Sequence, residues 1–590
     1  MENAVAFANN DVVTIAWSFG ARPAGCLGFS IHRVDSLGKA RALPSHAVFP
    51  GHTIAAGQTT DQFPIQKFYW KDPYARLEAE RTGRRTFSYR VIPLEGKPGA
   101  LTPMTSLPTL TTNTVTISAE AGPGVAAYFN RGLISTQRIS KALGGHPGAV
   151  SLKAHVADPA DPLRASLSGD MVEALLGFID RAAAGGRIYA ALYELHDDEL
   201  LAKLVTLRSK LHIVLSNAVV TDEVTKVRSD GNDAARAALK LAKAKVTDRI
   251  MPSNHIGHNK FLVYVDAAGK AQAVLFGSTN WTPSGLCTQT NNTMVIDDPA
   301  LANRYLLYWK QLSKDTTASA GVAKDLQGAG LRSWSESAKS FDVAGTAIQS
   351  WFSPNTPHAR KSKTTGEVRP VDMEAVAAKI AGAKHAVLFL AFYPGNPCVA
   401  NWAAAAQRAD KDLFVRGCVT NKSASEGFYY TLRGATPPPK PKGVKTVPRE
   451  DPRVIGADTF GKNDVPEGWQ REILKAGFAI IHDKVVVIDP FSDDCVVVTG
   501  SHNLGHKASY DNDENLVIVE GNKQLAVAYA THVLDIYDHF SWRWNVVRDG
   551  PKKAAQKLKS KPDQWLDKYF DTAGNIKVAQ LKFWMSAAAP

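Results

Sequence analysis

Hydrophobic runs long enough to cross a membrane are missing from this 590-residue sequence, although 44% of its residues are hydrophobic. A helix that spans a bilayer needs about 20 consecutive apolar residues. The first residues, MENAVAFANNDVV, also lack the basic start and the apolar stretch of a secretory signal peptide. We therefore expect a protein without membrane-spanning helices that stays in the cytoplasm or leaves the cell by a route without a signal peptide.

Cysteine is also scarce, and its placement argues against cysteine-based sites. Five cysteines are scattered along the chain without a CxxC pair or a Cys/His ligand spacing: Cys26, Cys287, Cys398, Cys418 and Cys495. Such spacing predicts neither a disulfide framework nor a zinc site. We expect small buried side chains at these positions, and a protein that needs neither a metal nor another cofactor.

Acidic residues are fewer than basic ones, 56 against 69, which gives a net charge of +13. A basic protein attracts anionic partners. Nucleic acid and an anionic membrane surface both carry phosphate groups. The charge therefore predicts a phosphate-bearing substrate without choosing between these two.

Residues 1–120 have the pattern of an all-β module. Hydrophobic residues alternate with polar or small ones at Val13, Ile15 and Trp17, and the same alternation returns in later segments between turn-forming residues. Several short strands with an early buried tryptophan are typical of a β-sandwich. This part resembles a fibronectin type III or immunoglobulin-like module. Because no catalytic grouping occurs in it, we expect a role in packing or attachment.

Beyond residue 120, helical and strand patterns alternate, which favours a layered α/β sheet. The helical segment MVEALLGFIDRAAA precedes the apolar run IYAALYEL, and later MEAVAAKIAGAK precedes HAVLFLAF. The same order of elements thus occurs twice, with a period of a little over 200 residues. We predict two duplicated α/β domains, residues 121–340 and 341–590.

Two stretches depart from this repeat. Residues 422–470 have the composition of a long irregular loop with the aromatic group FYY and Trp469, and loops of this length are often functional. After Trp544 the chain becomes rich in lysine, which indicates a solvated, basic C-terminal extension.

One constellation of residues occurs once in each half. The first half contains HNKFLVYVDAAGKAQAVLFGSTN and the second contains HDKVVVIDPFSDDCVVVTGSHN. The shared residues are His258, Lys260, Asp266, Ser278 and Asn280 in the first copy, and His482, Lys484, Asp489, Ser501 and Asn503 in the second. The aspartate and the glycine of GSxN are 11 residues apart in both copies. A match of this extent inside matching α/β repeats is far from chance.

These segments resemble the signature of the phospholipase D superfamily, HxKxxxxD followed by GSxN, and the resemblance covers roughly residues 123–545. The second copy has the full spacing, whereas the first has one extra residue between Lys260 and Asp266. The resemblance implies two α/β/α sandwich domains with one active site. It also implies a metal-independent phosphodiesterase whose two histidines act as nucleophile and as general acid and base, through a covalent phosphohistidine.

The residue types suit this chemistry. A histidine and a lysine two positions apart on a strand point to the same side. There the imidazole can attack phosphorus, while the ammonium balances charge on the phosphoryl oxygens. We assign catalytic roles to His258, Lys260, His482 and Lys484. The GSxN side chains Ser278, Asn280, Ser501 and Asn503 are assigned to phosphate binding.

A nucleophilic histidine needs a partner that fixes its tautomer, usually a carboxylate. The superfamily's acidic position after GSxN is Glu514 in the second copy, and the equivalent offset in the first copy falls on Asn291. We therefore expect Glu514 to pair with His482, which favours His482 as the nucleophile. In several two-motif relatives the first-copy histidine has this role, so the choice between His258 and His482 stays open.

Other residues near the motifs have simpler expected roles. Asp266, Asp489 and Asn291 are expected to be structural, and Trp281 is expected to pack under the site. His502 and His506 flank the second GSxN, and for both residues the sequence leaves open whether the side chain lies in the pocket or on the surface. The following are expected in a loop or in the core: His255, Glu194, His196, Phe392 and Tyr393.

Three classes of function remain. They are a phospholipase D that hydrolyses or transfers phospholipid head groups, a nuclease of the same superfamily, and a binding protein that kept the fold. The nearly complete motifs disfavour the third. Two-motif chains with large loops resemble the lipid enzymes more than the small one-motif nucleases, so we expect a phospholipid or membrane surface as partner and nucleic acid as the alternative. Because both motifs lie in one chain, a monomer should suffice, without an obligate protein partner.

Overall fold

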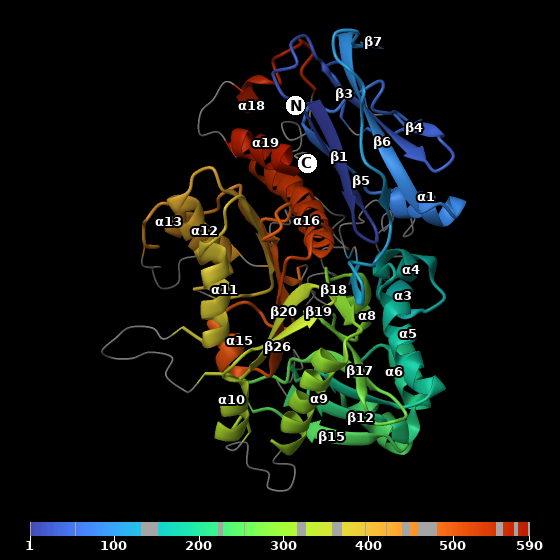
Figure 1. Cartoon of the computed structure of the whole chain (residues 1–590), viewed down its shortest axis with the longest axis vertical. Helices are drawn as coiled ribbons and strands as arrows, with labels where there is room; N and C mark the ends of the chain where they lie inside the picture. Colours follow the sequence, from blue (N-terminus) through green and yellow to red (C-terminus); the bar gives the residue numbers. More distant parts are fainter. Residues whose placement is uncertain are drawn as a thin grey trace.

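The computed structural model of the chain describes most of its length. The described residues are 2–45, 47–53, 55–130, 132, 152–221, 228–252, 254–315, 326–356, 369–395, 397–420, 422–438, 449–457, 481–549, 558–570 and 576–587. Figure 1 shows a β-rich module at one end of the molecule and the two α/β halves below it.

The first half is built on a seven-stranded mixed sheet. In spatial order its strands are β10 (Val125–Phe129), β18 (Asn292–Ile296), β17 (Ala271–Gly277), β16 (Lys260–Val265), β11 (Arg187–Leu192), β12 (Leu211–Ser216) and β15 (Lys245–Arg249). The last three are parallel to one another, and the other neighbours are antiparallel. A separate short hairpin is formed by β13 (Val220–Thr221) and β14 (Arg228–Ser229).

The second half repeats this order with one added edge strand. Its strands are β19 (Lys339–Val343), β20 (Thr346–Ser353), β26 (Glu514–Glu520), β25 (Val496–Gly500), β24 (Lys484–Ile488), β21 (Ala386–Ala391), β22 (Phe414–Val419) and β23 (Val454–Gly456). From β20 onward each strand matches one strand of the first sheet in order and direction. The predicted duplicated α/β fold is therefore confirmed.

Helices cover the faces of both sheets. In the first half they are α3 (Leu152–Ala157), α4 (Pro162–Ser168), α5 (Met171–Ala184), α6 (Asp198–Thr206), the 3-10 turn η2 (Arg208–Lys210), α7 (Asp233–Leu241), α8 (Pro283–Cys287), α9 (Pro299–Lys314) and α10 (Ala329–Ser335). In the second half they are α11 (Val371–Ala381), α12 (Val399–Ala409), α13 (Lys422–Leu432), α15 (His506–Asp511) and α16 (Lys523–Asp549).

Strand β21 shows why a sheet of this kind is buried on both faces. Val387 and Phe389 belong to one hydrophobic core, together with Val376 of α11, and Leu388 and Leu390 belong to another core that extends into α16. Alternate residues of a strand point to opposite faces. A continuous apolar run is therefore what a strand covered by helices on both sides requires.

The N-terminal module contains two sheets. One consists of β1 (Glu2–Ala8), β2 (Val13–Phe19) and β5 (Tyr69–Asp72), and the other of β4 (Ala40–Ala42), β3 (Gly28–Asp35), β6 (Thr86–Lys97), β7 (Ala100–Pro103), β8 (Leu110–Thr111) and β9 (Val115–Thr116). The prediction of an all-β module is wrong at α1 (Ala75–Thr82). This segment, ARLEAERT, is made of good helix formers, and it buries Ala75 and Ala79.

The C-terminal end is not the solvated extension that its lysines predicted. Helices α18 (Asp567–Phe570) and α19 (Ile576–Ala587) lie beside the N-terminal strands (Figure 1). Trp565 and Tyr569 are 2% exposed and belong to the core of the N-terminal module. Trp565 donates its indole N–H to the carbonyl of Cys26 (2.9 Å). The apolar residues that lie among the lysines of this segment thus pack against the N-terminal module.

The predicted irregular loop at 422–470 is also partly wrong, because α13 occupies its beginning. Phe428 of this helix is fully buried in the core of the second half, and the Arg433 guanidinium lies 3.7 Å from the ring of Tyr429. Trp469 lies outside the described residues.

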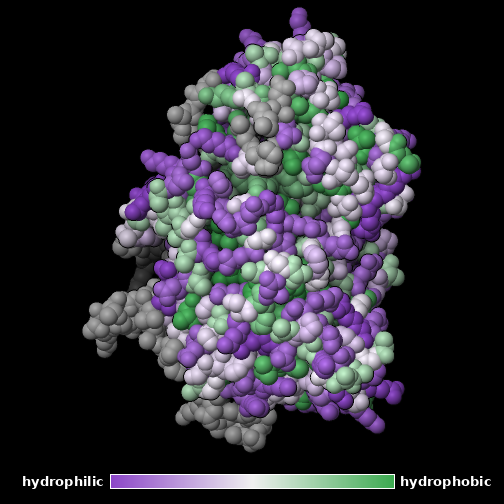
Figure 2. All heavy atoms as spheres, viewed as in Figure 1, coloured by the Kyte–Doolittle hydropathy of each residue, from purple (hydrophilic) through white to green (hydrophobic). Residues whose placement is uncertain are grey.

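The five cysteines are all buried and free, as predicted. Within the described ranges, no helix is both long enough and apolar enough to cross a membrane. Figure 2 shows hydrophilic residues spread over the face seen in Figure 1, with hydrophobic residues in small groups between them.

Candidate active site

The two halves place their motif histidines opposite each other. Lys260 begins β16 and Lys484 begins β24, and His258 and His482 each lie two residues before these strands. The two imidazole rings are 6.2 Å apart, centre to centre. Both residues are buried, since each histidine is 2% exposed. Two residues that lie 224 positions apart in the sequence thus share one site.

Backbone contacts fix this arrangement, because each motif is bonded to the other half. The His258 N–H donates to the carbonyl of Asp513 (3.0 Å), and the His482 N–H donates to the carbonyl of Thr290 (3.1 Å). The residue after each of these carbonyls is the one that the sequence assigned to orient a histidine. The start of β26 therefore lies next to the first motif, and the start of β18 lies next to the second.

The orienting residues consequently serve the opposite copy. Nδ1 of His258 is 2.9 Å from both carboxylate oxygens of Glu514. Nδ1 of His482 is 2.8 Å from the amide oxygen of Asn291. The predicted pairing of Glu514 with His482 is wrong, because Glu514 begins β26 and Asn291 directly precedes β18, and the start of each of these strands faces the motif of the other half.

These contacts decide which nitrogen carries the proton. An Nδ1–H that donates to an oxygen leaves the lone pair of a neutral imidazole on Nε2. Asn291 is itself held as an acceptor, because Ser278 donates its hydroxyl to the same oxygen (2.8 Å) and the Asn291 amide donates to the carbonyl of Gly285 (2.8 Å). Both histidines are thereby fixed in the same tautomer, one by a charged partner and one by a neutral partner.

Each lysine lies next to its own histidine and an aromatic ring. Lys260 donates to the carbonyl of His258 (2.6 Å), and Lys484 donates to the carbonyl of His482. The Lys260 ammonium is 5.1 Å from the ring of Tyr193, and the Lys484 ammonium is 4.8 Å from the ring of Phe392. These rings also contact the two histidines.

Tyr193 and Phe392 follow β11 and β21 at matching places. The expected core role of Phe392 is therefore wrong, since its ring forms a wall of the site. The sequence signal for this role was the identical place of both aromatic residues, just beyond equivalent strands.

Burial lowers the pKa values of all four basic groups, and repulsion by neighbouring positive charges adds to this shift at His258, His482 and Lys484. Burial, followed by the charges of Lys260 and Lys484, holds the pKa of both His258 and His482 well below the usual value. Burial lowers the pKa of Lys260 to about 7 and that of Lys484 well below its usual value. The surroundings of the site thus favour neutral histidines, and a bound anion would favour the charged form of the lysines.

The serine of each GSxN motif is hydrogen-bonded to the neighbouring strand of its own sheet. Ser278 accepts the backbone N–H of Asn292 and Ser501 accepts that of Asn515, both at 3.0 Å. The side-chain oxygens of Asn280 and Asn503 are buried, and neither has a hydrogen-bond partner among the described residues. Two polar groups of the motif are therefore available for rearrangement around a ligand.

Glu194 is a site residue that the sequence placed in the core. Its carboxylate accepts the side-chain amide of Asn280. Burial raises its pKa, while Lys260 opposes this shift. In the second half the equivalent position is Tyr393, which is 53% exposed and so does not have the expected core role either. The place that carries a carboxylate in the first half thus carries a tyrosine in the second half.

The two motif aspartates lie at the far ends of the motif strands. Asp266 accepts the backbone N–H of Lys270 (2.8 Å) in the turn after β16. Asp489 accepts the backbone N–H groups of His385 and Ala386, both at 2.7 Å, and so ties β24 to β21. Neither carboxylate contacts the histidines, which fits a structural role.

The remaining residues near the motifs have mostly structural surroundings. Trp281 is 1% exposed within the main core, as expected. His502 is buried between Ser509 and Asp372, at 2.9 and 3.3 Å, and His255 contacts Gln327 (2.7 Å). Within the described ranges, no cluster of three His, Cys, Asp or Glu side chains has the arrangement of a metal site.

A buried ion pair also joins the two halves, and the sequence did not indicate it. Arg249, the last residue of β15, pairs with Asp513, which precedes Glu514. The same guanidinium is 3.0 Å from Asp315. Arg249 and Asp513 are 264 residues apart, and no local pattern could link them.

The family model described as "Cardiolipin synthase, PLD-like domain" matches residues 175–312 and 377–537, just over half of the chain. Among solved structures, the chain is similar to the phosphatidylserine synthase of Haemophilus influenzae Rd KW20, with 13% identity, 72% of this chain and 94% of that chain covered, and a TM-score of 0.42.

Two other solved structures are similar over shorter stretches. Nuc from Salmonella typhimurium, a phospholipase D family member, has 22% identity over 24% of this chain and 84% of its own, with a TM-score of 0.19. Yeast tyrosyl-DNA phosphodiesterase has 12% identity over 57% of this chain and 85% of its own, with a TM-score of 0.28. Comparison with curated proteins gives no significant match. The family model covers both halves and all the paired motif residues, and the chain therefore belongs to the PLD-like domain family.

Proposed function

We propose that the protein is a phospholipase D-type phosphodiesterase that hydrolyses or transfers phospholipid head groups through a phosphohistidine. The observation that carries this proposal is the pair of buried imidazoles 6.2 Å apart, each oriented from the opposite half. The cardiolipin synthase description of the matching family supports a phospholipid substrate. The two buried lysines support a substrate with a phosphate group.

His258 is the proposed nucleophile. Attack of its Nε2 on phosphorus places positive charge on the ring, and the Glu514 carboxylate at Nδ1 stabilises that charge. Asn291 offers His482 only a neutral oxygen. The sequence favoured His482 as the nucleophile because Glu514 was expected to pair with it. The observed contact of Glu514 is with His258, which supports His258 as the nucleophile.

His482 is the proposed general acid. Substrate brings negative charge into the site, which raises the pKa of His482 and favours its protonation on Nε2. As the bond from phosphorus to the leaving oxygen breaks, this proton passes to that oxygen. The neutral His482 then removes a proton from water or an alcohol. The oxygen of that molecule attacks phosphorus and releases His258.

Lys260 and Lys484 are proposed to bind the non-bridging phosphate oxygens without a metal ion. Ser278, Asn280, Ser501 and Asn503 are proposed to add neutral donors. The buried amide oxygens of Asn280 and Asn503 have no partner among the described residues, which suits amides that reorient when substrate arrives.

The substrate class is tested with phosphatidylcholine vesicles and single-stranded DNA offered in parallel, with EDTA throughout. We expect choline release and intact DNA. Cut DNA with intact lipid would make the protein a nuclease of the same superfamily. Activity that disappears with EDTA and returns with a divalent cation would contradict metal independence.

The histidine roles are tested with a phosphatidyl ester of p-nitrophenol, whose leaving group needs no general acid. His482→Asn should still release about one equivalent of p-nitrophenol per site and retain the phosphatidyl group covalently, because attack is intact and breakdown is blocked. His258→Asn should release none. The reverse pattern would assign the nucleophile to His482.

A further inference from the structure

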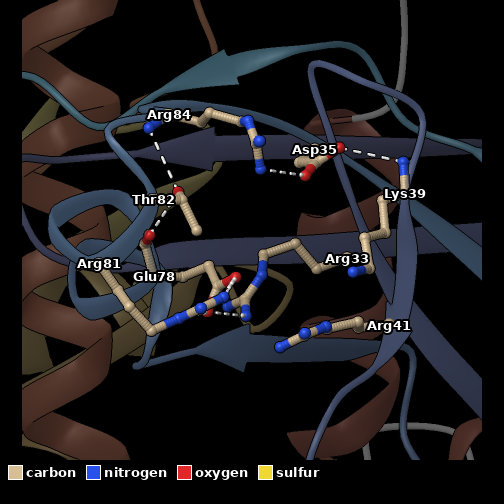
Figure 3. Close-up of a pocket in the computed structure, with 8 residues that line it drawn as sticks. All are labelled: Arg33, Asp35, Lys39, Arg41, Glu78, Arg81, Thr82 and Arg84. Atoms are coloured by element: carbon tan, nitrogen blue, oxygen red, sulfur yellow. Dashed lines mark hydrogen bonds and ion pairs between the residues drawn. The ribbon is translucent and has the colours of Figure 1, made fainter.

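A basic pocket of about 220 Å³ lies in the N-terminal module, away from the catalytic histidines. Its cationic lining residues are Arg33, Lys39, Arg41, Arg81 and Arg84. Figure 3 shows that these side chains reach one space from two directions, from strands β3 and β4 on one side and from the end of α1 on the other. Two carboxylates, Asp35 and Glu78, share the lining.

Three of the five cations are already paired. Arg33 is 2.7 Å from Asp72, Arg81 is 2.6 Å from Glu78, and Arg84 is 3.0 Å from Asp35. The hydrogen bond from Arg81 holds the pKa of Glu78 below its usual value. These ion pairs hold the side chains in place, and both carboxylates of the lining, Asp35 and Glu78, are already paired with an arginine.

Lys39 and Arg41 are left over. Within the described part of the chain, neither side chain forms an ion pair. Arg41 lies directly opposite Arg33 in the β3–β4 ladder, and like charges in directly opposed positions destabilise a sheet. The pocket therefore holds an excess of positive charge that an anion would balance.

A helix dipole accounts for only part of this charge. Basic residues favour the carboxyl end of a helix, and Arg81 stands in the last turn of α1. Lys39 and Arg41 come from the hairpin opposite the helix, so the dipole does not explain them. Arginine side chains arranged around one space suit phosphate, which accepts paired N–H groups.

We propose that this pocket binds the phosphate group of an anionic phospholipid and so docks the N-terminal module on a lipid surface. The tip of the same β3–β4 hairpin favours a lipid surface over a soluble anion. Leu37, between Asp35 and Lys39, is 73% exposed. An apolar side chain beside a basic pocket can enter the boundary between head groups and acyl chains while the cations hold the phosphate.

This inference does not rest on the proposed catalytic function, because the pocket and the histidine site share no residue. The two fail separately: vesicle binding is measured without turnover, and turnover is measured on a dispersed short-chain substrate. The pocket variants should keep full activity on the dispersed substrate.

The test is cosedimentation of the full chain with phosphatidylcholine vesicles, with and without phosphatidic acid. We expect binding that depends on phosphatidic acid and weakens as salt screens the charges. Lys39→Gln combined with Arg41→Gln should weaken this binding about tenfold or more, and Leu37→Ser should weaken it further. The matched control is Arg90→Gln with Lys97→Gln, which removes two exposed charges of the same module outside the pocket. The control should stay within about twofold of the unmodified chain.

Three results would overturn the proposal. The pocket variant could bind phosphatidic acid vesicles as well as the unmodified chain, or the control could lose as much binding as the pocket variant. Pocket-dependent binding of single-stranded DNA or of inorganic phosphate, without vesicle binding, would assign the pocket to a different phosphate source.

Discussion

Glu514 and Asn291 occupy equivalent positions in the two halves but differ in charge, and each contacts the other half's histidine. Glu514→Gln keeps a hydrogen-bonding side chain of the same size and removes the charge that, in the proposed mechanism, stabilises a phosphorylated His258. We expect kcat/KM to fall about 100-fold or more with little change in Tm.

Asn291→Asp is the complementary test at this scale. A carboxylate beside His482 favours the imidazolium and therefore raises the pKa of His482. The pH dependence of the leaving-group step should move to higher pH, as measured by pH–rate profiles with natural substrate. An unchanged profile would argue that His482 is not the acid.

Lys260 gives a prediction with a definite sign. Its pKa is about 7 in the folded chain and about 10.4 when exposed in the unfolded chain. Below pH 7 the lysine is charged in both states, and the cost of burying that charge is fully present. The cost falls as pH rises from 7 and vanishes above about 10.4.

Lys260→Met should therefore raise the free energy of unfolding most at pH 6 and least at high pH, while abolishing turnover. Urea denaturation at several pH values measures this difference. In the unmodified protein, kcat/KM should decline above about pH 7, because the free site then loses the proton on Lys260. A stability gain independent of pH would contradict the lowered pKa, because it requires Lys260 to have the same pKa in the folded and the unfolded chain.

At the scale of secondary-structure elements, contacts between strand ends hold the two halves together. The ion pair of Arg249 with Asp513 joins the end of β15 to the start of β26. Arg249→Met leaves the Asp513 carboxylate buried without its strongest partner, which typically costs about 3–5 kcal/mol. Activity should also fall, because the neighbouring Glu514 orients His258.

The double variant Arg249→Met with Asp513→Asn is the control, since it removes the unpaired charge. We expect it to be more stable than Arg249→Met alone in urea denaturation. Equal stability of the two variants would mean that the pair contributes little to holding the halves together.

At this scale the sequence predicted what is local and missed what joins distant segments. The repeated order of helices and strands follows from apolar runs such as 385–392, and HxK and GSxN mark the site without any structure. The partner of Glu514 could not be predicted from spacing, because the contact with His258 spans 256 residues. Helix α13 was missed because glycine, serine and aromatic residues give its segment the composition of a loop.

At the scale of the whole molecule, residues near the two ends of the chain share one hydrophobic core, because Trp565 packs inside the N-terminal module. Trp565→Ala removes a large buried side chain and should lower stability by about 3–5 kcal/mol. Trp542→Ala is the matched control, because Trp542 of α16 is 50% exposed. Denaturation midpoints for the two variants should differ clearly, and equal midpoints would contradict the packing of the C-terminal segment.

Both motif histidines of the site come from one chain. A mixture of His258→Ala and His482→Ala proteins should therefore show no recovery of activity, because no single molecule in it has both histidines. Recovery on mixing, measured against each variant alone, would require exchange of halves between molecules.

The unequal partners of the two histidines have a consequence for how a substrate enters. In a pair of identical subunits, both histidines would be held by the same residue type, and a phosphodiester could bind in either of two equivalent directions. Here both partners belong to one sequence, so they can differ: Glu514 contacts one histidine and Asn291 the other. This difference breaks the twofold symmetry of the site. In the proposed mechanism, with attack at His258 and proton donation at His482, a phosphodiester has one productive direction, so the residues on the two sides of the site are free to specialise, one side for the group that stays and the other for the group that leaves.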